Sequence, residues 1–266
     1  MIQQQATVLW NQPVGPGCYR MGLACTGGYE AAVPGQFVML QVEPGLAPLL
    51  RRPFSIFALI GDRDRPKGIE LLYKAVGKGT LKMARIESGQ RVDLLGPLGR
   101  GFRVNVGESS QIYLVAGGMG VAPIHFLATH LKQSGVDTTG YRLFLGGRSR
   151  ADVLCRDEFV AMGMPVTVTT DDGSSGEQCL ITDPLEEAVR RKAPDMIFAC
   201  GPHGMLHCLA GMAKRYHVAC QLSMETMMAC GMGACLGCAV PMAESGQGYR
   251  HVCVDGPVFD VGEVKW

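Results

Sequence analysis

The pattern of apolar and polar positions divides the chain into three regions. Up to about residue 102, short apolar runs are separated by turns rich in glycine and proline, such as GPG and GDRDRP. This pattern predicts strands over 34–42, 53–60, 69–77 and 90–99, and one short helix over 80–86. Several short strands with frequent turns favour a small antiparallel β-barrel.

From about residue 111 to 220, apolar strands alternate with amphipathic helices. This alternation predicts a parallel sheet with helices on both faces, and such sheets bind ligands beyond the carboxyl ends of their strands. The expected strands are 111–117, 142–147, 165–170 and 196–202, and the expected helices are 122–135, 151–162, 183–193 and 203–217.

The periodicity ends after residue 220, and residues 221–266 contain glycines and clustered cysteines. A segment this short supplies little core of its own, so we expect bound metal to organise it. The fold class is therefore β + α/β. We expect an N-terminal antiparallel β-barrel over 1–102, a parallel-sheet nucleotide-binding domain over 103–220 and a small C-terminal metal-binding domain over 221–266.

Composition excludes several functional classes. Hydrophobic residues make up 47% of the chain, which is enough for more than one core. Lys+Arg number 25 and Asp+Glu 24, so no basic field attracts nucleic acid or an anionic membrane. The N-terminal MIQQQATVLW does not resemble a signal peptide, and no apolar window is long enough to span a bilayer, so we expect a cytoplasmic protein.

Four of the eleven cysteines show the spacing C-x4-C-x2-C-x14-C. Two sulfide-bridged irons need two thiolates each, and C-x4-C-x2-C followed by a distant cysteine is the plant-type [2Fe-2S] arrangement. Glycines between the ligands let the loop wrap around the cluster. The expected ligands are Cys230, Cys235, Cys238 and Cys253, and the loop glycines are Gly231, Gly233 and Gly237.

A structural zinc site is the alternative for these cysteines. Such sites usually show two tight pairs of ligands, whereas Cys253 stands alone. Cys220 lies in the strand-like run VACQLSM, where we expect it to pack in the core. His251 would indicate a Rieske-type cluster only if it replaced a cysteine.

The segment RRPFSI in the barrel region offers groups that suit a flavin nucleotide. Arg52 is suited to a phosphate and Ser55 provides a hydroxyl. Their spacing places them on opposite faces of a regular strand, so a shared site needs a bulge or a strand end at Pro53. The alternative is a strand that simply opens with solvated arginines.

The segment VGKGT places Gly77, Gly79 and Thr80 before the expected helix. Free N–H groups and the dipole at a helix N-terminus favour a phosphate. The alternative is a plain glycine turn with Thr80 as the N-cap. Together with RRPFSI, this segment outlines one nucleotide site at the edge of the barrel.

Two loops at the strand ends of the parallel sheet suit a dinucleotide. The loop AGGMGVAP at 116–123 lets a pyrophosphate approach the backbone, although it is not the G-x-G-x-x-G fingerprint and also suits a packing turn. The sequence CGP at 200–202 ends the fourth strand on the same edge. Cys200 there either contacts a nicotinamide or is a buried small residue.

The order RPFS, GKGT, GGMGVAP, CGP and a four-cysteine tail resembles the ferredoxin-NADP reductase superfamily. More closely, ETMMACGMGACLGC with HVCVDGPVFD is similar to the electron-transfer subunits of class 1B dihydroorotate dehydrogenases, which serve pyrimidine biosynthesis. The similarity covers nearly the whole chain. It implies FAD against the barrel and a nicotinamide nucleotide on the parallel domain. It also implies that the cluster faces a separate FMN-containing catalytic subunit and that the two kinds of subunit form a hetero-oligomer, namely a heterotetramer.

The resemblance also assigns residues. It implies FAD contacts from Arg52, Pro53, Phe54, Ser55, Leu72, Tyr73, Lys74, Gly79 and Thr80. It implies that Gly117, Gly118, Gly120 and Pro123, with Cys200, Gly201 and Pro202, face the nicotinamide nucleotide, and that the four cysteines are the cluster ligands. Arg148 and Arg150, in LGGRSRAD, follow the second strand of the parallel domain where a 2′-phosphate could be held, so the sequence leaves NADP open beside the NAD that the family implies.

The mechanism implied is oxidation of dihydroorotate on the partner's FMN, single-electron passage through the cluster to FAD, and hydride transfer from FAD to NAD+. Ser55 is the candidate catalytic residue at the flavin edge, and Cys200 the candidate that sets the approach of the nicotinamide. One alternative is the reductase component of an oxygenase or of a sulfur- or glutamate-linked flavoprotein complex. Another is a zinc-stabilised scaffold with no enzymatic activity.

Overall fold

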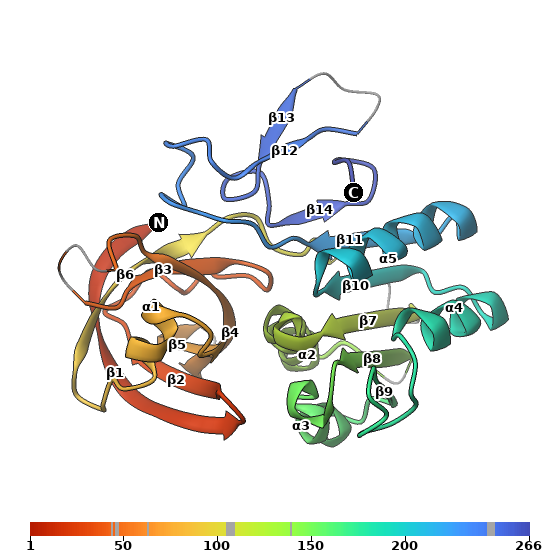
Figure 1. Ribbon diagram of the computed structural model, residues 1–266, viewed down its shortest axis with the longest axis horizontal. Coiled ribbons are helices and arrows are strands. Elements are labelled where there is room, and N and C mark those ends of the chain that lie inside the picture. Colours follow the sequence, from red (N-terminus) through yellow and green to blue (C-terminus); the bar gives the residue numbers. More distant parts are fainter. Residues whose placement is uncertain (44, 46–47, 63, 105–109, 139, 244–247) are drawn as a thin grey trace.

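The computed structural model describes residues 1–266 except 44, 46–47, 63, 105–109, 139 and 244–247. Its N-terminal part is a closed antiparallel barrel with the strand order β1-β2-β5-β4-β3-β6 (Figure 1). Alternate apolar side chains such as Val38, Leu40 and Ile69 fill the barrel core. The strands are β1 (Ile2–Gly15), β2 (Cys18–Ala24), β3 (Phe37–Gln41), β4 (Arg52–Asp62), β5 (Arg65–Lys74) and β6 (Arg91–Leu98), with helix α1 (Lys78–Met83) between the last two.

The second part is a mixed sheet with the order β14-β11-β10-β7-β8-β9. Five strands are parallel, and β14, which comes from the end of the chain, pairs antiparallel with β11 at the edge. The strands are β7 (Ile112–Gly117), β8 (Tyr141–Gly147), β9 (Val166–Thr170), β10 (Met196–Cys200), β11 (Ala219–Ser223) and β14 (Val258–Asp260).

Helices cover both faces of this sheet, as the apolar strands predict (Figure 1). Ile112 and Leu114 of β7 share a core with α2 (Val121–Gln133) and α3 (Arg156–Ala161). Tyr113 and Val115 share the opposite core with α4 (Thr182–Arg191) and α5 (His203–Tyr216). Alternate residues of one strand thus face two helical layers, which confirms the α/β architecture.

The helix expected over 151–162 is interrupted. The structure has a 3-10 turn, η2 (Arg150–Asp152), before α3 begins at Arg156. A similar 3-10 turn, η1 (Gly118–Gly120), precedes α2. Cys155, between η2 and α3, adopts a left-handed backbone with φ of 61°. Because an α-helix cannot continue through that conformation, the amphipathic segment forms the 3-10 turn η2 and the short helix α3.

The C-terminal region combines a hairpin, β12 (Ala239–Pro241) and β13 (Tyr249–His251), with β14 of the sheet. It has more core than its length suggests, because Val252 and Phe259 pack with Phe37, Met39 and Leu98 of the barrel. This shared core attaches the cysteine-rich segment to the barrel. The boundary expected at residue 220 falls within β11.

Charged groups join the barrel to the α/β part. Arg20 makes two hydrogen bonds of 2.8 Å to Glu70 and one of 3.0 Å to Glu158, and its guanidinium lies over the Phe57 ring. His125 of α2 lies 2.9 Å from Glu158 and stacks on Phe57, and its hydrogen bond lowers the pKa of Glu158. Within the described parts of the chain, no helix is long and apolar enough to cross a bilayer.

Candidate functional site

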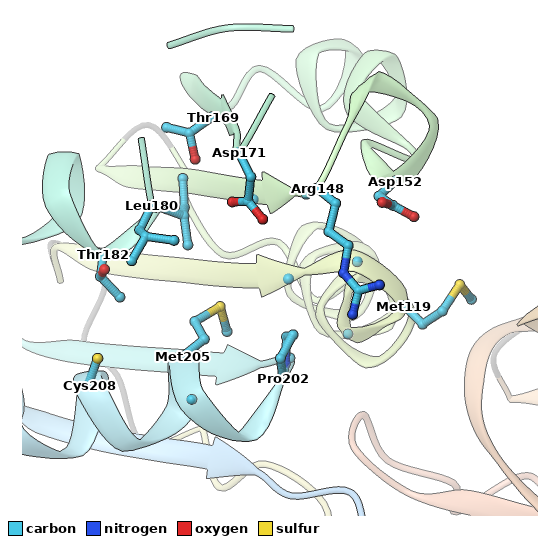
Figure 2. A pocket seen from close by; sticks show the side chains of 18 of the residues that line it. Met119, Arg148, Asp152, Thr169, Asp171, Leu180, Thr182, Pro202, Met205 and Cys208 are labelled. Carbon is cyan, nitrogen blue, oxygen red and sulfur yellow. The ribbon is translucent and has the colours of Figure 1, made fainter. Parts of the chain in front are cut away.

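A cavity of about 710 Å³ lies beyond the carboxyl ends of the parallel strands (Figure 2). Chain order in the sheet reverses between β7 and β10, and such reversals are where doubly wound sheets bind nucleotides. We call this cavity the dinucleotide pocket. Its wall includes the expected residues Gly117, Gly118, Gly120, Gly201, Pro202 and Arg148, together with Met119, Gly146, Gly147, Asp152, Thr169, Asp171, Leu180, Ile181, Thr182, Gly204, Met205, Cys208 and Glu225.

Close packing explains two glycines of the β7 loop, and open space surrounds a third. A Cβ atom on Gly120 would overlap the carbonyl of Cys200, and one on Gly117 would come within 2.7 Å of Pro202 Cδ. These two glycines therefore let the β7 and β10 loops pack closely. Gly118 has a φ of +53°, and a Cβ atom added there would have no neighbouring atom within 4 Å. The backbone at Gly118 is therefore open towards the pocket.

Cys200 and Pro123 lie beneath the pocket and not in its wall. Cys200 is only 1% exposed at the end of β10, its thiol interacts with the Ser223 hydroxyl, and burial raises its pKa. Pro123 is buried in the first turn of α2. Any influence of Cys200 on a bound nicotinamide therefore acts through the backbone of Gly201 and Pro202 or through Ser223.

A second cavity, of about 360 Å³, lies between the barrel, the start of α2 and the segment after β11. We call it the flavin pocket, because an apolar and aromatic wall with a few polar groups suits an isoalloxazine ring. Seven residues expected from the sequence line it: Pro53, Phe54, Ser55, Leu72, Tyr73 and Lys74 from the barrel, and Thr80 from α1. Residues not expected are Phe37, Val76, Met119, Ala122, Ser223, Met224, Glu225, Thr226, Met228 and Pro257.

Arg52 and Gly79 meet next to this pocket. A Cβ atom on Gly79 would lie 3.3 Å from Arg52 Nε, so the glycine leaves room for the guanidinium. Strand β4 begins at Arg52 and pairs with β3 in unbroken register through Ser55, and the register shift comes later, between Ile56 and Ala58. Neither a bulge nor a strand end lies at Pro53, so that expectation is wrong, and Arg52 is instead the first residue of β4. The contact with Gly79 nevertheless brings the two nucleotide-like segments together.

The N-cap of α1 is Gly77, not Thr80 as the alternative expected, and Thr80 is the third residue of the helix. Its Oγ1 accepts hydrogen bonds from the N–H groups of Val76 and Gly77, at 2.9 and 3.1 Å. The next N–H groups, at the first turn of α1, have no acceptor within the helix. These hydrogen bonds of Thr80 and the presence of free donors for a phosphate are therefore compatible.

An ion pair connects the two pockets. Lys74 lines the flavin pocket and Asp152 lines the dinucleotide pocket, and their side chains are 2.7 Å apart. The hydrogen bond to Asp152 raises the pKa of Lys74. Two sites on different domains thus share one charged contact.

Glu225 lines both pockets, and the sequence reasoning missed it. It is the second residue after β11, and the loss of solvent around its carboxyl group raises its pKa. A signal was available, because Glu225 is the first charged residue after a strand that ends at the ligand-binding edge of the sheet.

The four cysteines come together against the barrel as two pairs. Cys238 and Cys253 have sulfurs 3.2 Å apart, and the side chain of Cys235 interacts with that of Cys230. Two thiolates per iron is the requirement of a [2Fe-2S] cluster, so the donor set fits that group. Among the described residues, no three His, Cys, Asp or Glu side chains surround one point closely enough for a single metal ion.

Backbone N–H groups point at these sulfurs. Gly233 donates to Cys253 at 3.2 Å, and Met232 and Cys235 donate to Cys230 at 3.4 Å. Burial opposes ionisation of Cys230, but the hydrogen bonds outweigh it and lower its pKa to about 6. For Cys253, burial and the Cys238 thiol raise the pKa to about 12. The N–H groups thus favour the thiolate at Cys230, and Gly231 and Gly233 of the same loop adopt positive φ.

The two pairs differ in exposure. Cys238 and Cys253 are each 2% exposed, whereas Cys235 is exposed and Cys230 half-buried. The exposed side also presents Met227, Met232 and Leu236. Cys220 is buried in β11, as expected, and His251 donates its backbone N–H to Asp255.

Comparisons with known proteins agree with this geometry. Residues 225–265 match the iron-sulfur cluster binding domain of dihydroorotate dehydrogenase B, and residues 114–211 match the oxidoreductase NAD-binding domain. The chain is 37% identical over 263 residues to a protein of Desulforamulus reducens named dihydroorotate dehydrogenase B (NAD(+)), electron transfer subunit, covering 98% of this chain and 97% of that one. A Bacillus cereus protein of the same name is 37% identical over 268 residues, covering 99% of each.

Solved structures show the same fold. A structure described as the NADH-dependent reduced ferredoxin-NADP oxidoreductase superposes with a TM-score of 0.82 at 27% identity, covering 98% of this chain and 90% of that one. A ferredoxin NADP+ reductase from Neisseria gonorrhoeae with bound FAD and NADP superposes with a TM-score of 0.66 at 15% identity, covering 80% and 91%. At that identity the second likeness concerns the fold alone.

Proposed function

Because this chain belongs to the family of dihydroorotate dehydrogenase B electron transfer subunits, we propose that it connects the FMN of a separate catalytic subunit with NAD+. When bound, the [2Fe-2S] cluster exchanges single electrons, FAD links one-electron with two-electron transfer, and NAD+ accepts a hydride. The chain itself binds and orients these groups.

The single observation that carries this proposal is the order of the three candidate sites. The flavin pocket lies between the other two, because Glu225 lines it and the dinucleotide pocket together. On its other side, Thr226 and Met228 line the flavin pocket and Cys230 follows two residues later. Phe37 also lines this pocket and belongs to the core that holds Cys238 and Cys253. A cluster, a flavin and a nicotinamide fit this order without a gap.

We assign binding roles to the residues around these pockets. The barrel, proposed as the FAD domain over 1–102, would hold the flavin, with Arg52 at its phosphates and Ser55 at its reactive edge. The domain over 103–220 would hold NAD, and the domain over 221–266 the cluster on Cys230, Cys235, Cys238 and Cys253. The remaining FAD residues are Pro53, Phe54, Leu72, Tyr73, Lys74, Gly79 and Thr80, and the remaining nicotinamide residues are Gly117, Gly118, Gly120, Gly201 and Pro202. Pro123 and Cys200 lie beneath this wall, so they would position its backbone and not contact the nicotinamide.

The side chains where the two pockets meet would orient the nicotinamide and exclude water from it. Pro202 and Glu225 approach the junction from the two strand ends β10 and β11, and Met119 lines both pockets. Burial raises the pKa of Glu225, whose carboxyl group lines both pockets. Ser55 lines the same flavin pocket and offers a hydroxyl.

The partner would cover the exposed pair of cysteines. Cys235 and its neighbours Met232 and Leu236 are open to solvent, while Cys238 and Cys253 face the core shared with the barrel. An electron passing between subunits needs a short distance to the cluster. A partner bound over Cys235, Met232 and Leu236 would lie at such a distance. The partner proposed is the FMN-containing dihydroorotate dehydrogenase catalytic subunit, in a hetero-oligomer.

The test is co-expression with a candidate catalytic subunit, followed by measurement of dihydroorotate-dependent NAD+ reduction. We expect a co-purifying complex with FMN, FAD and iron-sulfur absorption, and NADH formation that requires both subunits. A Cys235→Ser variant serves as the internal control, because it should lose this coupling while NADH oxidation with an artificial acceptor persists.

A second candidate is the small subunit of another flavin and iron-sulfur complex, favoured by the 27% identity and full-length superposition on the NADH-dependent reduced ferredoxin-NADP oxidoreductase. A well-folded, flavin-loaded chain that binds no dihydroorotate dehydrogenase would support this second function against the first. Colourless protein with one zinc per chain would overturn both.

A further inference from the structure

The ion pair between Lys74 and Asp152 crosses from one domain to the other. Lys74 is the last residue of β5 and lines the flavin pocket, whereas Asp152 belongs to η2 and lines the dinucleotide pocket. Their side chains are 2.7 Å apart, and the carboxylate is the more buried partner, with 17% of its side chain exposed against 38% for Lys74. Because the lysine ammonium stands on a long flexible stem, its position depends on the group that binds it.

Asp152 is fixed by its own loop. Its backbone N–H donates to the Ser149 carbonyl at 2.9 Å, and a Cβ atom on Gly147 would come within 2.9 Å of the Asp152 Cβ. The same loop is attached to the barrel through Leu154, which is buried in one core with Cys18 of β2. The carboxylate therefore reaches Lys74 from a segment that is packed against both domains.

The charges around Lys74 make Asp152 its neutralising partner. Arg148 lines the dinucleotide pocket and lies close enough to Lys74 for its charge to oppose that ammonium. Figure 2 shows the Asp152 carboxylate and the Arg148 guanidinium on the same side of the pocket. Arg150 is directed elsewhere, since its Nε donates to the Ser174 carbonyl at 3.2 Å and it lines a separate cavity. Without Asp152, two positive charges would stand together at the boundary of the two pockets.

A charge at this boundary affects the redox balance of a flavin. A hydride carries two electrons and one proton, so its transfer from flavin to NAD+ removes one negative charge from the flavin and leaves NADH. An unpaired ammonium in the wall of the flavin pocket stabilises the reduced, negatively charged flavin. An ammonium paired with a carboxylate does so less, because the two opposite charges largely cancel at a distance.

We propose that Asp152 is a positioning residue for the flavin site, which holds and neutralises Lys74 and thereby keeps the reduction potential of bound FAD low enough for hydride donation to NAD+. This inference rests on the proposed function, because it requires FAD in the flavin pocket. It assigns an acid of the coenzyme domain to the redox balance of a cofactor on the barrel. The flavin has this balance only while the two domains are in contact.

The test is the reduction potential of the flavin in the full-length chain loaded with FAD and cluster, measured by absorbance against a reference dye of known potential. Asp152→Asn leaves the ammonium unpaired, so we expect the equilibrium to move about tenfold towards reduced flavin, which is about 30 mV for two electrons. Lys74→Gln leaves the carboxylate unpaired and should move the equilibrium about tenfold the other way. The double variant removes both charges and should return to within about twofold of the natural chain.

Glu158→Gln is the matched control. Glu158 makes another ion pair between the domains, 3.0 Å from Arg20, and it belongs to the wall of neither pocket. Weakening the domain contact there should leave the flavin equilibrium within about twofold of the natural value. Opposite shifts in the two single variants that cancel in the double variant indicate charge compensation, since structural damage has no reason to change sign.

Flavin potentials that stay within about twofold of the natural equilibrium in both single variants, or that move in the same direction, would overturn the inference while the proposed function stands. If Asp152→Asn does not fold, Lys74→Gln still decides, because its expected shift has the opposite sign. A well-folded natural chain that takes up no FAD would remove the proposed function, and the inference with it.

Discussion

The carboxyl edge of the sheet and the cysteine segment are built in contrasting ways. At the sheet edge, ligand-facing residues follow strands that are hydrogen-bonded to neighbours over five or more residues, and glycines are required there by the protein's own packing. The cysteines lie in loops on either side of a hairpin whose two strands have three residues each. Many of the contacts of their sulfurs are with backbone N–H groups. The hydrogen-bonded sheet and its own packing shape the first site, whereas the second depends on what its sulfurs bind.

The sharpest test of this contrast is Cys253→Ser. We expect loss of the iron-sulfur absorption and at least about tenfold faster amide exchange over 228–243 and 248–254, because binding energy of the cluster is folding energy for this segment. Exchange in β7 and β10, and NADH oxidation with an artificial acceptor, should stay within about twofold. Mass-detected hydrogen exchange measures both regions in one experiment.

Cys25→Ser is the control for that variant, because Cys25 lies in the barrel, where its Sγ interacts with the Leu23 carbonyl and the Ile69 backbone and takes no part in the cysteine segment. It should keep the absorption and the exchange pattern. Equal acceleration in the sheet and in the cysteine segment would contradict the contrast.

Gly120→Ala tests the other side of the comparison. The added Cβ would overlap the Cys200 carbonyl, which belongs to a central strand and cannot move aside. We expect the free energy of unfolding to fall by about 1–3 kcal/mol, with no ligand present. Urea unfolding followed by far-ultraviolet circular dichroism measures it.

Gly211→Ala is the matched control for Gly120→Ala. Gly211 lies in α5 with nothing within 4 Å of its Cβ direction, so alanine there should raise the free energy of unfolding by up to about 1 kcal/mol. If both variants behaved alike, the β7 loop would not be shaped by packing.

A smaller effect is expected from Glu158→Gln at the contact between barrel and sheet. His125 lowers the pKa of Glu158 below the ordinary value of 4.5, so its contribution to stability is present above about pH 4.5 and is lost as the pH falls through the folded value. The free energy of unfolding of the natural chain should therefore decline more steeply from pH 6 to pH 3.5 than that of the variant. Asp157→Asn, at a side chain that is 95% exposed, should retain the natural slope.

Much of the architecture was predictable from local pattern. Alternating apolar strands and helices predicted the parallel sheet, and the segments RPFS and GKGT predicted a nucleotide site on the barrel. Strands β1 and β2 were not predicted individually, because polar positions such as Gln3 to Gln5 obscure the apolar alternation. Strand β14 was not predicted either, since it completes the sheet from a distant part of the chain.

The sequence by itself determined the cysteine spacing, the glycine loops and the family, because these depend on residue types at short separations. Only the tertiary structure decided that Glu225 adjoins both pockets, that Cys200 lies below the pocket wall, and that Arg148 and Arg150 diverge. Those facts depend on how strand ends far apart in the chain meet at one edge of the sheet. Local sequence does not encode such meetings, and on this chain they decide which groups face the coenzyme.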